Sequence, residues 1–293
     1  MKFFRWGPKG QEKPGAMDAD GVHRDISDLL PDIAGDGLGQ PMLNLLQSTD
    51  LSVCPIVPAS ARRGPCVGRV GKFICVGLNY ADHAAESGMD VPEEPVLFFK
   101  ATSAICGPDD NIIIPRAATK TDWEVELGVV IGKDASYIDV EDAQDHIAGY
   151  CVINDLSERA FQLERSGQWV KGKSADTFGP IGPYLVTPDE VPDPGNLNIW
   201  LEIDGKRVQN GNTRTMIFKI PFLVSYISQF MSLQAGDVIS TGTPPGVGLG
   251  MDPPTYLVAG QKMRVGIDGL GEQNQMTVPW KKENTTTRLA EVS

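Results

Sequence analysis

Three acidic residues in two strand-like segments have the types and spacing of a metal-binding site. Glu124 and Glu126 lie in W-E-V-E-L-G-V-V-I-G, and Asp155 ends Y-C-V-I-N-D. Side chains alternate along a strand, so Glu124 and Glu126 converge on one face and repel each other unless a cation lies between them. Oxygen ligands without a nearby Cys or His favour Mg²⁺ or Mn²⁺ over Zn²⁺. An E-x-E pair taken alone favours a solvated strand face, so the hypothesis depends on the residues around it.

A histidine and a glutamate form a second candidate group. In G-L-N-Y-A-D-H-A-A-E-S-G, His83 and Glu86 are three residues apart, so on a helical turn they share one face and can form a hydrogen bond. A carboxylate that orients an imidazole produces a general base for water. The chain has only three histidines, which narrows the choice. The alternative is an ordinary surface or packing histidine.

Polar residues after Asp155 could bind an organic acid. N-D-L-S-E-R-A-F-Q places Arg159 and Gln162 on the same side of a predicted helix, and Lys173 follows in V-K-G-K-S. Near a metal, an Arg, a Gln and a Lys could bind carboxylate and keto oxygens. Ordinary surface charge is the alternative.

A glycine-rich turn follows a predicted strand further along the chain. S-T-G-T-P-P-G-V-G-L-G lacks the G-K-[ST] ending of a phosphate-binding loop, which argues against a nucleotide site. A turn that presents backbone N–H groups and the Thr243 hydroxyl to a small ligand fits the residues better.

Composition excludes several classes of protein. The chain has 293 residues, long enough for one large domain or a main domain with a small appendage. Its 26 basic and 38 acidic residues give a net charge of -12, which argues against a nucleic-acid or anionic-membrane surface. The start, M-K-F-F-R-W-G-P-K-G, lacks the apolar stretch of a signal peptide, and no segment is long enough to span a bilayer. We therefore expect a cytoplasmic protein that acts on a small molecule. The five cysteines include no C-x-x-C pair, so we expect mostly buried thiols.

The predicted elements are mainly strands. Residues 1–70 are punctuated by Pro and Gly and read as a small N-terminal module, in which D-I-S-D-L-L and P-M-L-N-L-L-Q are predicted short helices. Residues 71–281 contain many short apolar runs bounded by Gly, Pro, Asp or Asn, and one clear amphipathic helix, K-I-P-F-L-V-S-Y-I-S-Q-F-M. Strands and helices do not alternate regularly, which argues against a Rossmann or βα-barrel fold and favours a mainly β domain with some α. Residues 282–293 form a polar tail.

Taken in order, these motifs resemble the fumarylacetoacetate hydrolase family. The resemblance rests on C-V-G-L-N-Y-A-D-H-A-A-E, P-V-L-F-F-K, W-E-V-E-L-G-V-V-I-G, N-D-L-S-E-R-A-F-Q, G-K-S-A-D-T-F-G-P and T-G-T-P-P-G-V-G, between about Gly71 and Trp280. It implies an α+β fold, a mixed β-roll built from short sheets, which is usually dimeric and has its site at the mouth of the roll. It also implies that the segment from Asn79 to about Pro95 is a lid that orders when ligand binds.

The resemblance also implies a role for each candidate residue. One Mg²⁺ or Mn²⁺ per chain would be held by Glu124, Glu126 and Asp155, and the catalytic residues would be His83, Glu86 and Lys173. Substrate contacts would come from Arg159, Gln162 and Thr243, with Tyr80 and Lys100 as weaker candidates.

The implied reaction is hydrolysis of a carbon–carbon bond. The N-terminal module is similar to that of family members that act on 2,4-diketo-3-deoxy-rhamnonate or -fuconate. We therefore predict metal-dependent cleavage of the C3–C4 bond of a 2,4-diketo-3-deoxy sugar acid, giving pyruvate and a hydroxy acid such as lactate, by a homodimer. The alternatives are an acylpyruvate hydrolase, an oxaloacetate decarboxylase or, in another class, a non-catalytic binding or scaffold protein.

Overall fold

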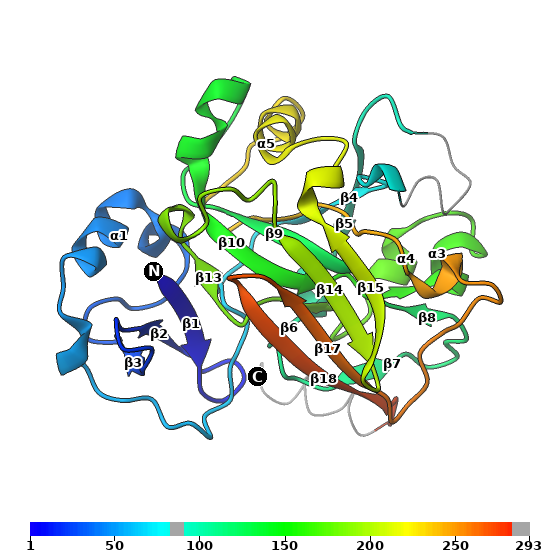
Figure 1. Cartoon of the computed structure of the whole chain (residues 1–293), viewed down its shortest axis with the longest axis horizontal. Coiled ribbons are helices and arrows are strands. Elements are labelled where there is room, and N and C mark those ends of the chain that lie inside the picture. Colours follow the sequence, from blue (N-terminus) through cyan, green and yellow to red (C-terminus); the bar gives the residue numbers. More distant parts are fainter. Residues whose placement is uncertain (83–90, 283–293) are drawn as a thin grey trace.

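Strands make up most of the structure, a computed structural model that describes residues 1–82 and 91–282 (Figure 1). The strands are β1 (Lys2–Trp6), β2 (Lys13–Met17), β3 (His23–Asp25), β4 (Phe73–Gly77), β5 (Val96–Lys100), β6 (Ile105–Cys106), β7 (Ile112–Ile114), β8 (Thr121–Asp122), β9 (Val125–Ile131), β10 (Ile147–Asn154), β11 (Ser157–Glu158), β12 (Gly179–Pro180), β13 (Leu185–Val186), β14 (Asn198–Ile203), β15 (Lys206–Asn212), β16 (Val238–Ser240), β17 (Lys262–Ile267) and β18 (Gly271–Pro279). The α-helices are α1 (Gln40–Gln47), α3 (Arg159–Leu163), α4 (Val170–Lys173) and α5 (Ile220–Ser228).

A nine-stranded sheet connects the N-terminal segment to the rest of the molecule. Its strand order is β3-β2-β1-β13-β10-β9-β16-β4-β5. β1 pairs with β13 antiparallel, with Phe3 opposite Leu185, so the first strands continue the sheet of the larger part rather than forming a sheet of their own. In Figure 1 they lie at one side of the molecule, next to β13. The division at about residue 70 stays a prediction.

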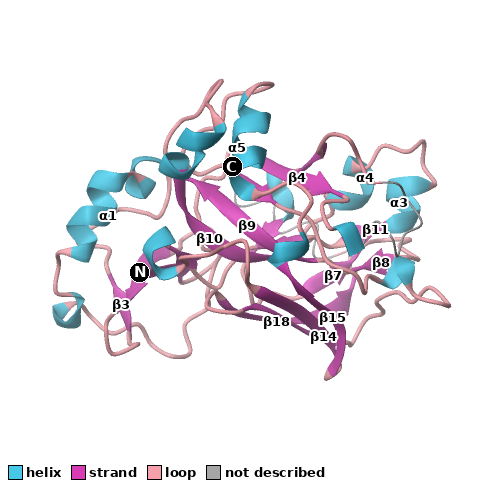
Figure 2. Ribbon diagram, turned by 45° about the horizontal axis from the view of Figure 1, so that its top comes forward, coloured by secondary structure: helices cyan, strands magenta, loops and turns pink. Residues whose placement is uncertain are grey.

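A five-stranded sheet packs against the centre of the large one. Its order is β15-β14-β17-β18-β7, and two short strand pairs, β11-β8 and β12-β6, complete the described sheets. Most neighbouring strands are antiparallel, whereas β16 with β4, β18 with β7 and β12 with β6 are parallel. In Figure 2, β9 and β10 lie in the middle of the molecule, above β14, β15 and β18 of the smaller sheet. Short mixed sheets with few helices are the architecture that the sequence predicts.

The core is buried on both faces of β9 and β10. Val125, Leu127 and Val129 belong to a cluster that also contains residues of α5 and of the five-stranded sheet. The alternate residues, such as Val130 and Ile153, belong to a second cluster with the N-terminal segment. Because both faces are covered, nearly every residue of these two strands is inaccessible to water. Four of the five cysteines are buried and none forms a disulfide, as predicted.

Two short helices are predicted in the N-terminal segment, and one of these predictions is wrong. P-M-L-N-L-L-Q does form most of α1, but D-I-S-D-L-L forms the end of β3 and a single turn. The backbone N–H groups of Leu29 and Leu30 both donate to the carbonyl of Ile26, and no further helical turn follows. The next residue, Pro31, has no N–H to donate and disfavours helical geometry at the residue before it.

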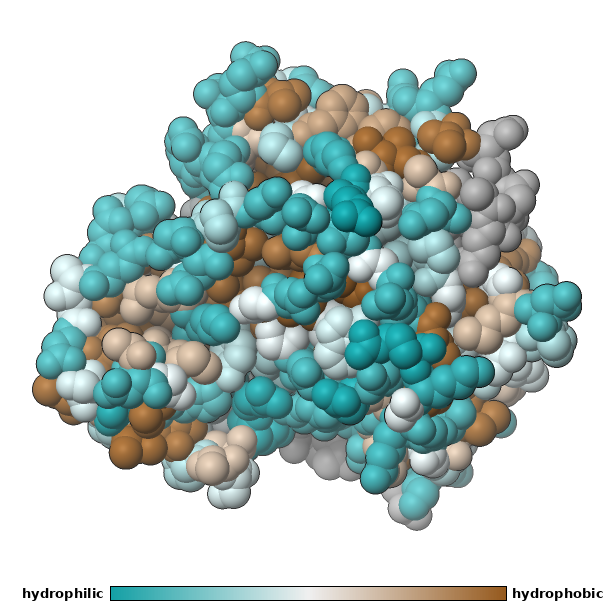
Figure 3. All heavy atoms as spheres, in the orientation of Figure 1, coloured by the Kyte–Doolittle hydropathy of each residue, from teal (hydrophilic) through white to brown (hydrophobic). Residues whose placement is uncertain are grey.

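Hydrophilic side chains cover most of one face of the molecule (Figure 3). The face in Figure 3 is mostly hydrophilic, and hydrophobic side chains come to it near α5; Phe222 and Phe230 there are 38% and 63% exposed. Among the described residues, no helix has the length and apolar character needed to cross a bilayer.

Candidate metal and substrate site

The three predicted carboxylates meet where β9 begins and β10 ends. β9 and β10 are antiparallel, with Glu126 opposite Ile153, so Glu124 and Asp155 lie at the same end of the pair. One oxygen of each of the three carboxylates lies within 4.8 Å of the others. Glu124 is 6% exposed, Glu126 2% and Asp155 fully buried. The alternative of a solvated strand face is therefore wrong. Among the residues that the structure describes, this is the one cluster of three or more acidic, His or Cys side chains so close together.

The glycine-rich turn after β16 holds Glu126 in place. The Ser240 hydroxyl and the Gly242 N–H both donate to Oε2 of Glu126, at 2.6 and 2.8 Å. Gly242 has a φ of +99°, and a Cβ there would lie 2.8 Å from Cβ of Asn79, so only glycine fits. The sequence predicted that backbone N–H groups of this turn face a small ligand, whereas the N–H of Gly242 binds a carboxylate of the protein.

Thr243 also bonds within the protein. Its hydroxyl donates to the carbonyl of Val125 at 2.9 Å. A hydroxyl has one proton to donate, so Thr243 can approach a substrate only as an acceptor or through its methyl group. Its predicted contact with substrate remains a prediction.

Three buried cations surround the carboxylates. Nζ of Lys173 lies 2.6 Å from Oε2 of Glu124 and 2.8 Å from Oδ2 of Asp155. Arg159 donates to Oε1 of Glu124 at 2.6 Å and to Asp122 at 2.8 Å. Lys100 donates to the other oxygen of Asp155 and to a backbone carbonyl. The alternative of ordinary surface charge is excluded, because all three side chains are almost completely buried.

The cations do not compensate the three carboxylates equally. Burial alone would raise the pKa of Glu124, but Lys173 and Arg159 outweigh it and the pKa falls well below its ordinary value. Burial and the charges of Asp155 and Glu124 raise the pKa of Glu126 well above 4.5. Among the described residues, no Lys or Arg forms an ion pair with Glu126, and the attraction of Lys173 only partly offsets the rise. An all-oxygen donor set with unbalanced negative charge fits a hard divalent cation such as Mg²⁺ or Mn²⁺.

We expect the stability of the metal-free protein, relative to a Glu126→Gln variant, to fall as pH rises above about 4.5, the ordinary pKa of this carboxyl. Below that pH the carboxyl is protonated in both states; above it the unfolded chain ionises freely while the folded chain keeps the proton or ionises at a cost. Folding is therefore opposed increasingly until pH exceeds the raised pKa. Thermal melts of both proteins between pH 4 and 8, without metal, measure the difference. A difference in melting temperature that stays constant with pH would contradict the raised pKa of Glu126. Adding Mg²⁺ should make the difference depend less on pH.

A cavity of about 210 Å³ opens onto the carboxylates. Its polar lining consists of the following side chains: Glu124, Glu126, Arg159, Gln162, Lys173 and Thr243. Nη1 of Arg159 donates to Oε1 of Gln162 at 3.1 Å, which confirms that these two residues share one side of α3. The rest of the lining is mostly apolar, with Leu163, Phe98, Trp169, Val247 and Leu249 among its side chains.

Two predicted substrate contacts do not line this cavity. Lys100 is buried behind it as a counter-charge to Asp155. Tyr80 is buried too, and its hydroxyl has no hydrogen-bond partner among the described residues. His83 and Glu86 fall outside the described residues, as does the middle of the predicted lid, residues 83–90.

Sequence reasoning missed Asp122 and Gln209. Asp122 is buried and accepts from Nε of Arg159 and from the backbone N–H groups of Gly248 and Leu249. The signal for it was present, because Asp122 extends the two-residue spacing of Glu124 and Glu126 to D-x-E-x-E. Gln209 carries no comparable local signal.

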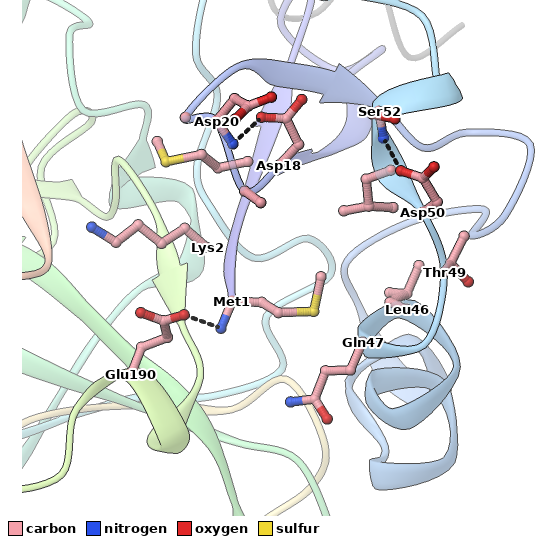
Figure 4. A pocket seen from close by; sticks show the side chains of 14 residues that line it. Met1, Lys2, Asp18, Asp20, Leu46, Gln47, Thr49, Asp50, Ser52 and Glu190 are labelled. Carbon is pink, nitrogen blue, oxygen red and sulfur yellow. Dashed lines mark hydrogen bonds and ion pairs between the residues drawn. The ribbon is translucent and has the colours of Figure 1, made fainter.

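A second, larger cavity of about 540 Å³ lies between the start of β1 and α1 (Figure 4). Its acidic side chains are spread around the wall and are engaged locally. Asp18 accepts from the backbone N–H of Asp20 and Val22 and pairs with Arg24, and Asp50 accepts from the N–H of Ser52. It offers no convergent set of ligands comparable to the carboxylate triad.

Comparison with known proteins decides the family. Residues 72–278 match the sequence profile described as fumarylacetoacetate (FAA) hydrolase C-terminal. The chain belongs to the fumarylacetoacetate hydrolase family. This confirms the resemblance found in the sequence and, with the structural matches below, the predicted α+β fold.

Relatives of this family member cover nearly all of it. A protein of Burkholderia multivorans is 62% identical over 278 residues, which are 94% of this chain and 99% of that protein. Its name calls it a candidate hydrolase and states no substrate. The solved fumarylacetoacetate hydrolase of Exiguobacterium antarcticum is 33% identical, with a TM-score of 0.82, and maleylpyruvate hydrolase from Sphingobium sp. SYK-6 is 28% identical, with a TM-score of 0.79. Each match covers 96% of this chain and the whole of the other. The family is enzymatic and includes hydrolases of related acids.

Proposed function

We propose that this family member hydrolyses the C3–C4 bond of a 2,4-diketo-3-deoxy sugar acid, giving pyruvate and a hydroxy acid such as lactate. One observation carries the proposal: two carboxylates of the buried triad, those of Glu124 and Glu126, face the same cavity as a wall of cationic and amide side chains. Such a cavity suits a small acid that carries several oxygens next to a divalent cation. The proposal includes one Mg²⁺ or Mn²⁺ per chain, a homodimer and a cytoplasmic location.

The carboxylates and Gln162 have distinct parts in this reaction. Glu124, Glu126 and Asp155 would hold the ion, which when bound draws electrons from the C2 carbonyl and so favours the negative charge that cleavage leaves at C3. Because Arg159 holds the oxygen of Gln162, the amide NH₂ of Gln162 is the group left to bind a substrate oxygen.

The remaining residues stabilise negative charge and transfer a proton. Lys173 stabilises negative charge that develops on the reacting carbonyl oxygens. His83, oriented by Glu86, takes a proton from the water that attacks C4. The C3–C4 bond then breaks, its electron pair stays on C3, and protonation of C3 gives pyruvate.

The apolar part of the wall favours a second candidate, an acylpyruvate hydrolase. Leu163, Trp169, Val247 and Leu249 line the cavity beside the charged groups. Apolar side chains offer no hydrogen bonds to the hydroxyl groups of a sugar acid, whereas they suit an alkyl or aryl acyl group. A non-catalytic protein is a poorer explanation, because burying three carboxylates together is costly and serves no packing purpose.

The experiment is an assay of the purified protein with Mg²⁺. Pyruvate formation would be followed with a 2,4-diketo-3-deoxy sugar acid, acylpyruvates of increasing chain length, and oxaloacetate. Preference for the sugar acid supports the proposal, and preference for a long acyl chain supports the second candidate. A His83→Ala variant should lose hydrolysis by about 10²-fold or more but lose less of the decarboxylation of oxaloacetate, which needs no attacking water. No turnover of any dioxo acid would overturn the proposal.

A further inference from the structure

Gln209, on the five-stranded sheet, forms hydrogen bonds with the segments that carry and support the carboxylate triad. It lies on β15, the edge strand of that sheet, and is fully buried. Its Oε1 accepts from the backbone N–H of Val125 at 2.9 Å. Its Nε2 donates to Oγ1 of Thr243 at 2.9 Å and to the carbonyl of Pro244 at 2.8 Å. One amide thus joins the E-x-E segment to the glycine-rich turn.

Val125 is held on both of its backbone groups. Gln209 binds its N–H, the Thr243 hydroxyl binds its carbonyl at 2.9 Å, and these two side chains bind each other. The three residues form a closed ring of hydrogen bonds around the residue that separates Glu124 from Glu126.

This end of β9 needs such support. β9 pairs with β16 only from Gly128 to Val130, so no strand of the described residues lies beside the backbone of Val125 on that edge. Side chains leave the backbone in directions set by the peptide planes on either side of each Cα. A rotation of the peptide groups at Val125 would therefore move the two glutamate carboxylates relative to each other.

Gln209 is fully buried, and the glycine-rich turn packs closely against the strand that carries it. The turn lies directly on β15: a Cβ at Gly211 would be 2.5 Å from Cβ of Pro244, and a Cβ at Gly246 would be 2.0 Å from the carbonyl oxygen of Val208. Loss of the amide would leave a buried backbone N–H without a partner, and such groups are rare in native proteins.

We propose that Gln209 is a positioning residue that sets the separation of the Glu124 and Glu126 carboxylates and thereby the affinity for the divalent cation. The proposal rests on the proposed function, since it assumes that these carboxylates bind the ion. Gln209 is not among the residues that line the cavity, so its proposed role is indirect.

Substitution by leucine tests this role. Gln209→Leu keeps most of the volume and removes all three hydrogen bonds. We expect Mn²⁺ affinity, measured by titration calorimetry, to fall by about 10-fold to 100-fold, the usual loss when a residue that orients a metal ligand is removed. Hydrogen exchange of the metal-free protein should become faster across residues 123–127, which reports the local backbone independently of any metal.

Gln273→Leu is the matched control. Gln273 is equally buried and on the same sheet, and its amide donates to three backbone carbonyls, those of Val152, Pro180 and Gly182. Its loss should lower the melting temperature while Mn²⁺ affinity stays within about threefold of wild type, below the 10-fold loss expected of an orienting residue. Equal losses of affinity in both variants would show general destabilisation and overturn the role of Gln209.

A second pair of variants covers the case in which Gln209→Leu does not fold. Thr243→Val removes the hydroxyl that completes the ring, and Thr243→Ser retains it, so valine should weaken Mn²⁺ binding and serine should restore it. Wild-type affinity in the valine variant would overturn the proposal. If the wild-type protein binds no Mn²⁺, the proposed function fails and this inference with it; if it binds Mn²⁺ and Gln209→Leu binds it equally well, only this inference fails.

Discussion

Glu126→Ala should abolish most of the activity and weaken Mn²⁺ binding in the same variant. Glu126 is the triad carboxylate with which no Lys or Arg of the described residues forms an ion pair, so we expect it to depend most on the ion. A bound metal contributes several kcal/mol of charge stabilisation to a transition state, and each 1.36 kcal/mol is tenfold in rate, so we expect a loss of about 10³-fold or more. Steady-state assays and titration calorimetry measure the two effects.

A buried aspartate at the other end of β16 provides the control for this variant. Asp237 accepts from the backbone N–H groups of Lys72 and Gln234 and pairs with the Lys72 ammonium. Asp237→Ala should therefore lower the melting temperature without changing Mn²⁺ affinity. Unchanged Mn²⁺ affinity in Glu126→Ala would show that the assignment of this ligand is wrong.

Lys173→Met should lower the turnover number by about 10²-fold to 10³-fold, the loss typical of removing one group that stabilises developing negative charge. Lys173 bridges Glu124 and Asp155, and its Nζ lies 4.9 Å from the centre of the Phe98 ring on the cavity wall. Methionine is unbranched and close in length, so it fills the same space without the charge. The melting temperature of the metal-free variant should also fall, because two buried carboxylates lose a partner.

Lys171 supplies a matched control on the same helix. Its side chain is exposed and donates to the backbone carbonyl of Arg165. Lys171→Met removes a positive charge of the same kind, two residues away, without touching the carboxylates, so activity should stay near the wild-type value. Similar losses in the two variants would mean that the net charge of the region matters rather than the contact made by Lys173.

Local sequence patterns alone determined several strands, one helix and the convergence of two pairs of site residues. The strands at β4, β5 and β9 follow from short apolar runs bounded by turn residues, and the amphipathic helix at α5 from its periodicity. The convergence of Glu124 and Glu126 follows from alternation along one strand, and Arg159 and Gln162 share a side because they are three residues apart on α3. These features depend on backbone geometry within a few residues, which the sequence expresses directly.

Tertiary structure alone decided which distant groups complete the site. Lys100 meets Asp155 across 55 positions of the chain, and Gln209 meets Val125 across 84. These contacts depend on the order of strands in two sheets, and no local pattern in the chain specifies that order. The same reason explains why the sequence did not predict that the Thr243 hydroxyl binds the Val125 carbonyl or that the Gly242 N–H binds Glu126. The sequence alone predicted the three carboxylates and their metal chemistry. The hydrogen bonds that fix the positions of these carboxylates form only when the sheets have assembled.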